Sequence, residues 1–205
     1  MSIHLFKLFI LFTRNLATLI NSPYIAFRKL SKGEEVYQSI FIFLLAFIYF
    51  SFASAIRKGI RNPYLLTLEL NRLIFFAALG FLFSILLLYK LGKLFGGSAN
   101  LKGIFLSWSY SLIPTIIWFF VTSISYLLLP PPRTLSAPGQ VFSLIFIAFS
   151  LALLFWKLVM YYLTLRFSLK LDLVKIMGIS LIVAPLFGLY GLLMYRIGVF
   201  RIPFI

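Results

Sequence analysis

Five long apolar stretches constrain this chain more than any other feature, because each is close to the roughly 20 residues that a helix needs to cross a lipid bilayer. They cover about residues 36–56, 73–91, 104–129, 141–165 and 176–195. Only 11% of the residues are charged, whereas soluble chains carry roughly 25%. A soluble domain of 205 residues could not bury so much apolar surface, so the sequence predicts an all-α integral membrane protein with five transmembrane helices.

The first stretch shows how strongly insertion is favoured. Val36 to Ile56 carries no charge and contains 12 residues of the Leu, Ile, Phe or Val type. On an insertion scale these residues contribute about 4–7 kcal/mol, which exceeds the cost of the few Ser and Gln side chains. Residues 36–205 are therefore expected to form one membrane domain, preceded by a juxtamembrane segment of residues 1–35.

The N-terminal segment reads as an amphipathic helix over residues 3–21. The following polar residues recur at helical spacing along one side: His4, Lys7, Arg14, Thr18 and Asn21. Apolar residues occupy the opposite face: Leu5, Phe9, Phe12, Leu16 and Leu19. Such a helix either lies in the headgroup layer or packs on the bundle, and both arrangements use the same apolar face.

The chain between that helix and the first stretch is expected to be a surface connector. Pro23 cannot continue a helix, and Tyr24 to Glu35 is rich in charge. Lys7 and Arg14 interrupt the N-terminal apolar run, so this end is not typical of a cleaved signal peptide and is expected to be retained.

Prolines interrupt two of the stretches. Pro114 and Pro185 each remove a helical hydrogen bond, which predicts a kink or a break. The run Pro130-Pro131-Pro132 is expected to end the third stretch. Gly103, Ser107 and Ser111 recur every four residues, and such a face of small residues lets another helix approach closely.

The net charge of +15 fits a membrane protein rather than a nucleic-acid binder. Basic residues flank transmembrane helices, where they fix orientation and meet anionic lipid headgroups. A nucleic-acid interface would need a basic face on a water-soluble fold, so none is predicted. Basic residues are more frequent on the side of the N-terminal segment, which predicts a cytoplasmic N-terminus.

Groups that could do chemistry are scarce. The chain has no cysteine and one histidine, and its four acidic residues are expected to lie outside the apolar stretches: Glu34, Glu35, Glu69 and Asp172. A multi-histidine metal site and a carboxylate proton relay are both disfavoured. No catalytic, cofactor-binding or metal-binding residue is predicted, and the protein is not expected to be an enzyme.

Lys157 is the ionisable residue inside an apolar stretch. A charge at that depth is costly, so a functional role is the default hypothesis. The alternative is that Lys157 lies near the interface and snorkels to the headgroups, and this is the favoured interpretation.

A group of short motifs around the third stretch carries a resemblance. Leu94-Phe95-Gly96-Gly97 is followed by Leu101-Lys102-Gly103, then Trp108-Ser109-Tyr110-Ser111 and Pro114. Upstream, Pro23, Phe27 and Leu30 precede the first stretch. This block resembles the signature of the Yip family, the Rab/Ypt-interacting multi-span membrane proteins and their prokaryotic relatives. The candidate interaction residues taken from it are Gly96, Gly97, Gly103, Ser107, Trp108, Ser111 and Pro114.

The resemblance implies a five-helix membrane protein without catalysis. Eukaryotic members bind small GTPases and partner membrane proteins in vesicle traffic, and they carry a longer soluble N-terminal region. Only about 35 residues precede the first stretch here. This departure argues against small-GTPase binding and favours a prokaryotic member in the cytoplasmic membrane.

Three functions follow as hypotheses. The first is a non-catalytic scaffold or adaptor that binds other membrane proteins or organises lipid. The second is a small-solute transporter or channel, in which prolines create broken helices whose ends bind a solute. The third is a lipid-modifying enzyme, which the lack of a candidate base makes the least supported.

Overall fold

All five apolar stretches are helical in the computed structural model, which describes residues 2–58, 62–98, 100–128 and 136–199. The helices are α1 (Ser2–Asn21), α2 (Pro23–Leu30), the 3₁₀ turn η1 (Val36–Gln38), α3 (Ser39–Lys58), α4 (Pro63–Leu94), α5 (Leu101–Tyr110), α6 (Ile113–Leu128), α7 (Ala137–Ser168) and α8 (Leu173–Arg196). Within the described ranges, five segments are long and apolar enough to cross a membrane: η1 with α3, α4, α5 with α6, α7, and α8. The all-α multi-pass fold is thus confirmed.

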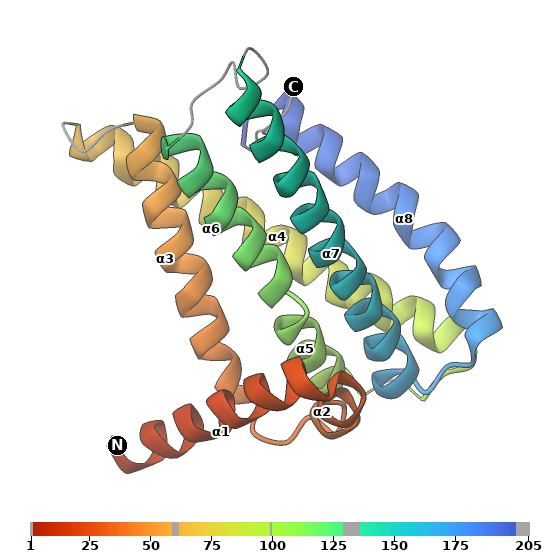
Figure 1. The fold of residues 1–205 in the computed structure, drawn as a ribbon. Helices are drawn as coiled ribbons and strands as arrows, with labels where there is room; N and C mark the ends of the chain where they lie inside the picture. Colours follow the sequence, from red (N-terminus) through yellow and green to blue (C-terminus); the bar gives the residue numbers. More distant parts are fainter. Residues whose placement is uncertain (1, 59–61, 99, 129–135, 200–205) are drawn as a thin grey trace.

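The spanning helices run between two ends of the molecule (Figure 1). α1 and α2 lie across one end, and α3, α7 and α8 extend from there toward the other, as do α5 and α6 in succession. α4 crosses diagonally behind α6 and α7. The described chain begins at the α1 end, whereas α8 finishes at the opposite end, as five crossings require.

The second spanning helix is longer than predicted. α4 begins at Pro63, ten residues before the expected start at 73, because proline fits the first turn of a helix, where its missing N–H costs nothing. Its 32 residues measure about 48 Å, which exceeds the roughly 30 Å hydrocarbon core. Glu69 therefore lies inside a helix and is buried, so its placement outside the apolar elements was wrong.

The two intramembrane prolines behave differently. Pro114 lies in the first turn of α6, directly after a break at Ser111 and Leu112 that separates α6 from α5. Pro185 lies inside α8, which continues past it without interruption. The proline run at 130–132 lies outside the described residues.

The expected surface connector after Pro23 is instead a packed helix. The proline occupies the first position of α2, and Phe27 and Leu30 on this helix are almost completely buried. Both belong to the hydrophobic cluster that also contains residues of α3, α5, α6 and α7. The apolar residues at positions 26, 27 and 30 bury this short helix despite its exposed Arg28 and Lys29.

The short helix α5 lies between two hydrophobic clusters. Leu106 and Tyr110 belong to the cluster around α1, α2 and α3, while Ile104 and Trp108 belong to the cluster around α4, α7 and α8. Seven of its ten residues are buried. The helix that carries the sequence motif is therefore the most enclosed element of the described structure.

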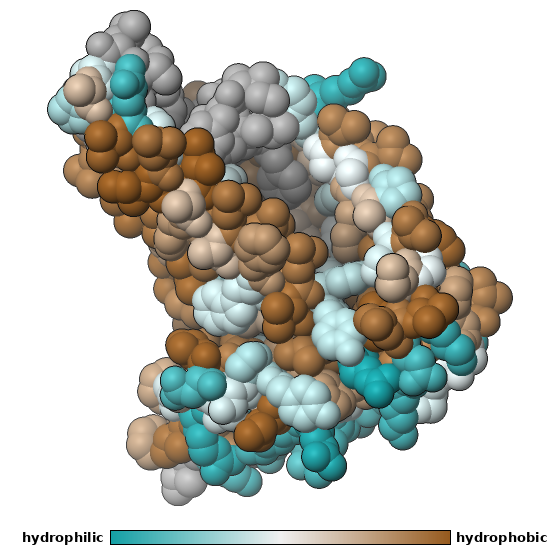
Figure 2. All heavy atoms as spheres, turned by 45° about the vertical axis from the view of Figure 1, so that its right-hand side comes forward, coloured by the Kyte–Doolittle hydropathy of each residue, from teal (hydrophilic) through white to brown (hydrophobic). Residues whose placement is uncertain are grey.

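α1 packs on the bundle and still exposes apolar side chains. The side chains of Leu8, Phe12 and Leu19 are buried, whereas those of Phe6 and Ile10 are exposed on another side of the same helix. Figure 2 shows apolar residues covering the flank of the molecule, with hydrophilic residues gathered at the lower end, where Figure 1 places α1 and α2.

Candidate functional site

The break between α5 and α6 is held by a lysine from another helix. Pro114 has no N–H to give to the carbonyl of Tyr110, so the break leaves carbonyl groups at the end of α5 without their usual partners. Lys157 of α7 donates from Nζ to the backbone oxygen of Ser111 at 2.6 Å and contacts Ser111 Oγ at 3.2 Å. A cation at the C-terminal end of a helix also meets the negative end of its dipole.

Trp108 completes this contact. The Lys157 ammonium lies 5.0 Å from the centre of the Trp108 ring, a cation–π arrangement. The same ring packs against Tyr161 of α7 and Phe187 of α8. Lys157 thus bonds to protein groups, and the favoured interpretation that it snorkels to the headgroups was wrong. The residues Trp108, Ser111 and Lys157 are called the helix-break cluster below.

At the glycine pair, the backbone at the end of α4 packs closely against the backbone at the end of α7. The Gly97 N–H donates to the Gly92 carbonyl at 2.8 Å and closes the end of α4. A Cβ added at Gly97 would lie 2.5 Å from the backbone oxygen of Leu169, so only glycine fits. Gly96 has a φ of +77°, a conformation in which glycine carries no steric penalty.

Gly103 is a second site of close backbone packing, here against the end of α2. A Cβ at Gly103 would clash with the backbone oxygen of Ser31. Asn100 lies beside it and donates from Nδ2 to the carbonyl of Lys32 at 3.1 Å and, more weakly, to that of Ser31 at 3.4 Å. The loop after α2 is therefore fixed on the N-terminus of α5.

Ser107 faces α7 one turn further along α5. The hydroxyl of Ser168 donates to Ser107 Oγ at 3.0 Å, and both residues are buried. Gly103, Ser107 and Ser111 thus face three different partners: the end of α2, Ser168, and Lys157. The structure brings the motif residues together as packing and hydrogen-bonding contacts of α5.

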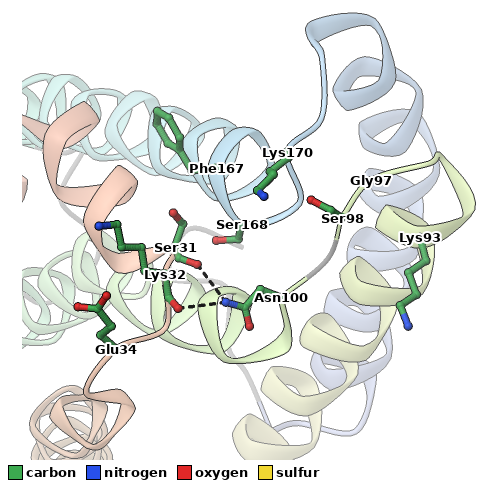
Figure 3. A pocket seen from close by; sticks show the side chains of 10 residues that line it. All are labelled: Ser31, Lys32, Glu34, Lys93, Gly97, Ser98, Asn100, Phe167, Ser168 and Lys170. Atoms are coloured by element: carbon green, nitrogen blue, oxygen red, sulfur yellow. Dashed lines mark hydrogen bonds between the residues drawn. The ribbon is translucent and has the colours of Figure 1, made fainter.

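The three loops that meet at this end line an open cavity of about 660 Å³, called the loop cavity here (Figure 3). It is lined by Ser31, Lys32, Glu34, Lys93, Gly97, Ser98, Asn100, Phe167, Ser168 and Lys170. In Figure 3 the side chains of Lys170 and Ser98 point into the same space beside Asn100, whereas the side chains of Lys32 and Lys93 extend away from it. The lining contains three lysines and one glutamate, so its charge is positive.

A buried polar cluster ties α1 to the bundle. Gln38 Oε1 accepts hydrogen bonds from Asn15 Nδ2 and from the Tyr110 hydroxyl, each at 2.7 Å. All three side chains are at least 95% buried. Sequence reasoning missed this cluster; the available signal was a single asparagine on the apolar face of α1, between Phe12 and Leu19.

Within the described ranges, no group of three or more His, Cys, Asp or Glu side chains lies close enough to hold a metal ion. The arrangement offers instead a cationic cavity, a lysine-held helix break and several glycine contacts. Such features suit the binding of a ligand or partner.

Comparison with known proteins gives one match. A family model described as "Yip1 domain" matches residues 17–195, which is most of the chain. The matched region includes α2, the glycine pair, the helix-break cluster and all five spanning segments. No curated protein and no solved structure matches the chain.

Proposed function

The chain belongs to the Yip1 domain family of membrane proteins, and from that membership we propose that it is a non-catalytic scaffold or adaptor for other membrane proteins. The observation that carries the proposal is that three loops are held together by two motif glycines and by the asparagine that lies between them in the sequence. Gly97, Gly103 and Asn100 fix three loops against one another at one end of the bundle. The three loops together form one charged surface. Because their positions are fixed, a partner protein can bind this surface without first ordering it.

The orientation is part of the proposal. The loop end carries α1, α2, the loop after α2, and the loops α4–α5 and α7–α8 with the helix ends beside them; together these hold 11 of the 19 basic residues. By the positive-inside rule this end faces the cytoplasm, in a prokaryotic cytoplasmic membrane. The exposed Phe6 and Ile10 of α1 would then lie in the headgroup layer beside the bundle.

Capture of partners from native membranes tests the proposal. The protein would be purified in mild detergent, and co-purifying proteins would be counted by quantitative mass spectrometry. We expect at least one membrane protein at near-stoichiometric level. Substituting Gly103→Val should displace the α2 loop and remove that partner, whereas Gly188→Val, at a position where a Cβ meets no atom within 4 Å, should retain it. A wild-type protein that arrives alone would overturn the proposal.

A transport function is the second candidate, because α5 and α6 form a broken helix and such helices bind solutes in transporters. Lys157 already occupies the carbonyl of Ser111 at the break, which favours a structural role for it. Solute uptake into proteoliposomes tests this candidate. Uptake that Lys157→Met abolishes, with the fold intact, would favour transport over scaffolding.

A further inference from the structure

We propose that the loop cavity binds the phosphate group of an anionic phospholipid headgroup. The proposal rests on the scaffold function only for the placement of this end at the membrane surface. It names a ligand class that the family match does not provide.

The first support is the chemistry of the lining. A lysine ammonium group and a serine hydroxyl both bind phosphate oxygens, and Lys170 and Ser98 supply one of each to the cavity. Lys170 and Ser98 point into the same space (Figure 3). The cavity volume of about 660 Å³ lies within the roughly 300–1,000 Å³ range of small-molecule sites.

The second support is the backbone of Lys170. Its φ is +53°, a left-handed conformation that a lysine rarely adopts. Arg166 closes this loop by donating from Nη1 to the Leu171 carbonyl and to Asp172 Oδ1, each at 2.8 Å. Arg166 and Asp172 thereby balance each other, which leaves Lys170 as the cation that the loop presents to the cavity. Strained residues of this kind concentrate at ligand-binding sites.

The third support is the position of the cavity relative to the lipid. Phe167 lines one wall and packs edge-on against the exposed Tyr24, with 4.8 Å between ring centres. Tyrosine is enriched at the membrane interface. Basic pockets between helices at that depth bind anionic headgroups. A phosphate held there would leave its acyl chains beside the apolar outer face of α7, where Leu158 and Phe155 are exposed.

Glu34 is the acidic residue in the lining, and it lies at the edge. In Figure 3 its carboxylate is separated from Lys170 by the Ser31–Lys32 backbone. A phosphate bonded to Lys170 and Ser98 is therefore not placed beside this carboxylate.

Titration of the purified full chain in detergent with short-chain phosphatidic acid tests the proposal, with native mass spectrometry as the readout. Wild-type protein should bind one molecule saturably. Lys170→Gln should weaken binding about tenfold, as expected for loss of a charge-assisted contact. Lys29→Gln removes an exposed lysine from α2 outside the cavity and serves as the matched control, with affinity unchanged.

A second variant separates binding from folding. Lys170→Gly removes the ammonium but suits the left-handed backbone, so it should raise thermal stability while weakening phosphatidic acid binding. Equal affinity in the wild type and both Lys170 variants would overturn the proposal. An equal loss of affinity in Lys29→Gln would overturn it as well.

Competition identifies the source of the phosphate. Inorganic phosphate that fails to displace the lipid at a comparable concentration supports a headgroup site, and displacement at that concentration would show a site for free phosphate and overturn the headgroup assignment. Partner capture is measured separately on the same variants. The two proposals can therefore fail separately. Loss of lipid binding with the partner retained would overturn the lipid site alone, and lipid binding without a partner would overturn the scaffold function alone.

Discussion

The ammonium of Lys157 lies 2.6 Å from the backbone oxygen of Ser111, at the point where the third spanning segment is broken. α7 thus supplies the cation that donates a hydrogen bond to an unpaired carbonyl at the end of α5. Pro114 creates the need for this contact, since it cannot donate the hydrogen bond that would continue α5 into α6.

Lys157→Met should destabilise the protein. The substitution keeps most of the side-chain volume but leaves the Ser111 carbonyl without its charged donor, and losses of this kind cost about 1–3 kcal/mol. Thermal unfolding in detergent would measure the effect. Lys90→Met, at an exposed lysine of α4, is the control and should change stability little. Equal unfolding temperatures for wild type and Lys157→Met would contradict this account.

Pro114→Ala should make Lys157 less important. Alanine restores an N–H, which allows α5 and α6 to join and lets backbone donors replace the lysine. In a double-mutant cycle, the cost of Lys157→Met should fall by at least about 0.5 kcal/mol when Pro114 is also replaced. The free energies of unfolding of the four proteins give the coupling. Simple additivity would show that the proline and the lysine act independently.

Gly103→Ala should be destabilising by about 1–3 kcal/mol, the usual cost of overpacking. Its Cβ would meet the backbone oxygen of Ser31, and a backbone atom cannot rotate away as a side chain can. Gly188→Ala is the matched helical control, because a Cβ there meets no atom within 4 Å. Since alanine favours helix by up to about 1 kcal/mol over glycine, the control should be neutral or stabilising. Denaturant unfolding of both variants checks the prediction, and a Gly103→Ala protein as stable as the control would refute it.

Gln38→Leu should release α1 from the bundle. Gln38 Oε1 accepts from both Asn15 and Tyr110, so its loss leaves two buried donors unpaired at about 1–3 kcal/mol each. Hydrogen exchange of the α1 amides should accelerate more than in Asn15→Leu or Tyr110→Phe, each of which removes one donor. Combining all three substitutions should restore part of the protection, because no unpaired polar group then remains. Uniform exchange rates across the set would contradict the account.

Hydropathy alone predicted the fold well. Long uncharged runs such as Val36 to Ile56 have one physical outcome in a membrane, a spanning helix. The helix ends were predicted less well, because Thr67 and Glu69 of α4 lower the local hydropathy without breaking the helix. The sequence predicts a surface connector where the structure has α2, because the charged residues of this segment mask its buried apolar face.

The contacts of the site could be predicted only in part. The motif residues could be identified from the sequence. Many of the contacts at this site, however, are to backbone carbonyls, and because every residue has one, the residue type does not reveal which carbonyl is the partner. Asn100 bonds to carbonyls 68 and 69 residues away, and Lys157 bonds to one 46 residues away. Lys170 gave no signal at all, because its left-handed backbone follows from the loop that Arg166 closes.

The lysine-held break also has a consequence for biogenesis. Ser111 leaves the ribosome 46 residues before Lys157, which at roughly 5–20 residues per second is a delay of about 2–9 s. During that interval the carbonyls at the break in the third segment lack their lysine donor. We expect this segment to remain at the insertion machinery until α7 follows it, so that the two leave as a pair. Crosslinking of nascent chains in which residue 157 has or has not emerged from the ribosome would show the release, and Pro114→Ala should allow the third segment to leave alone.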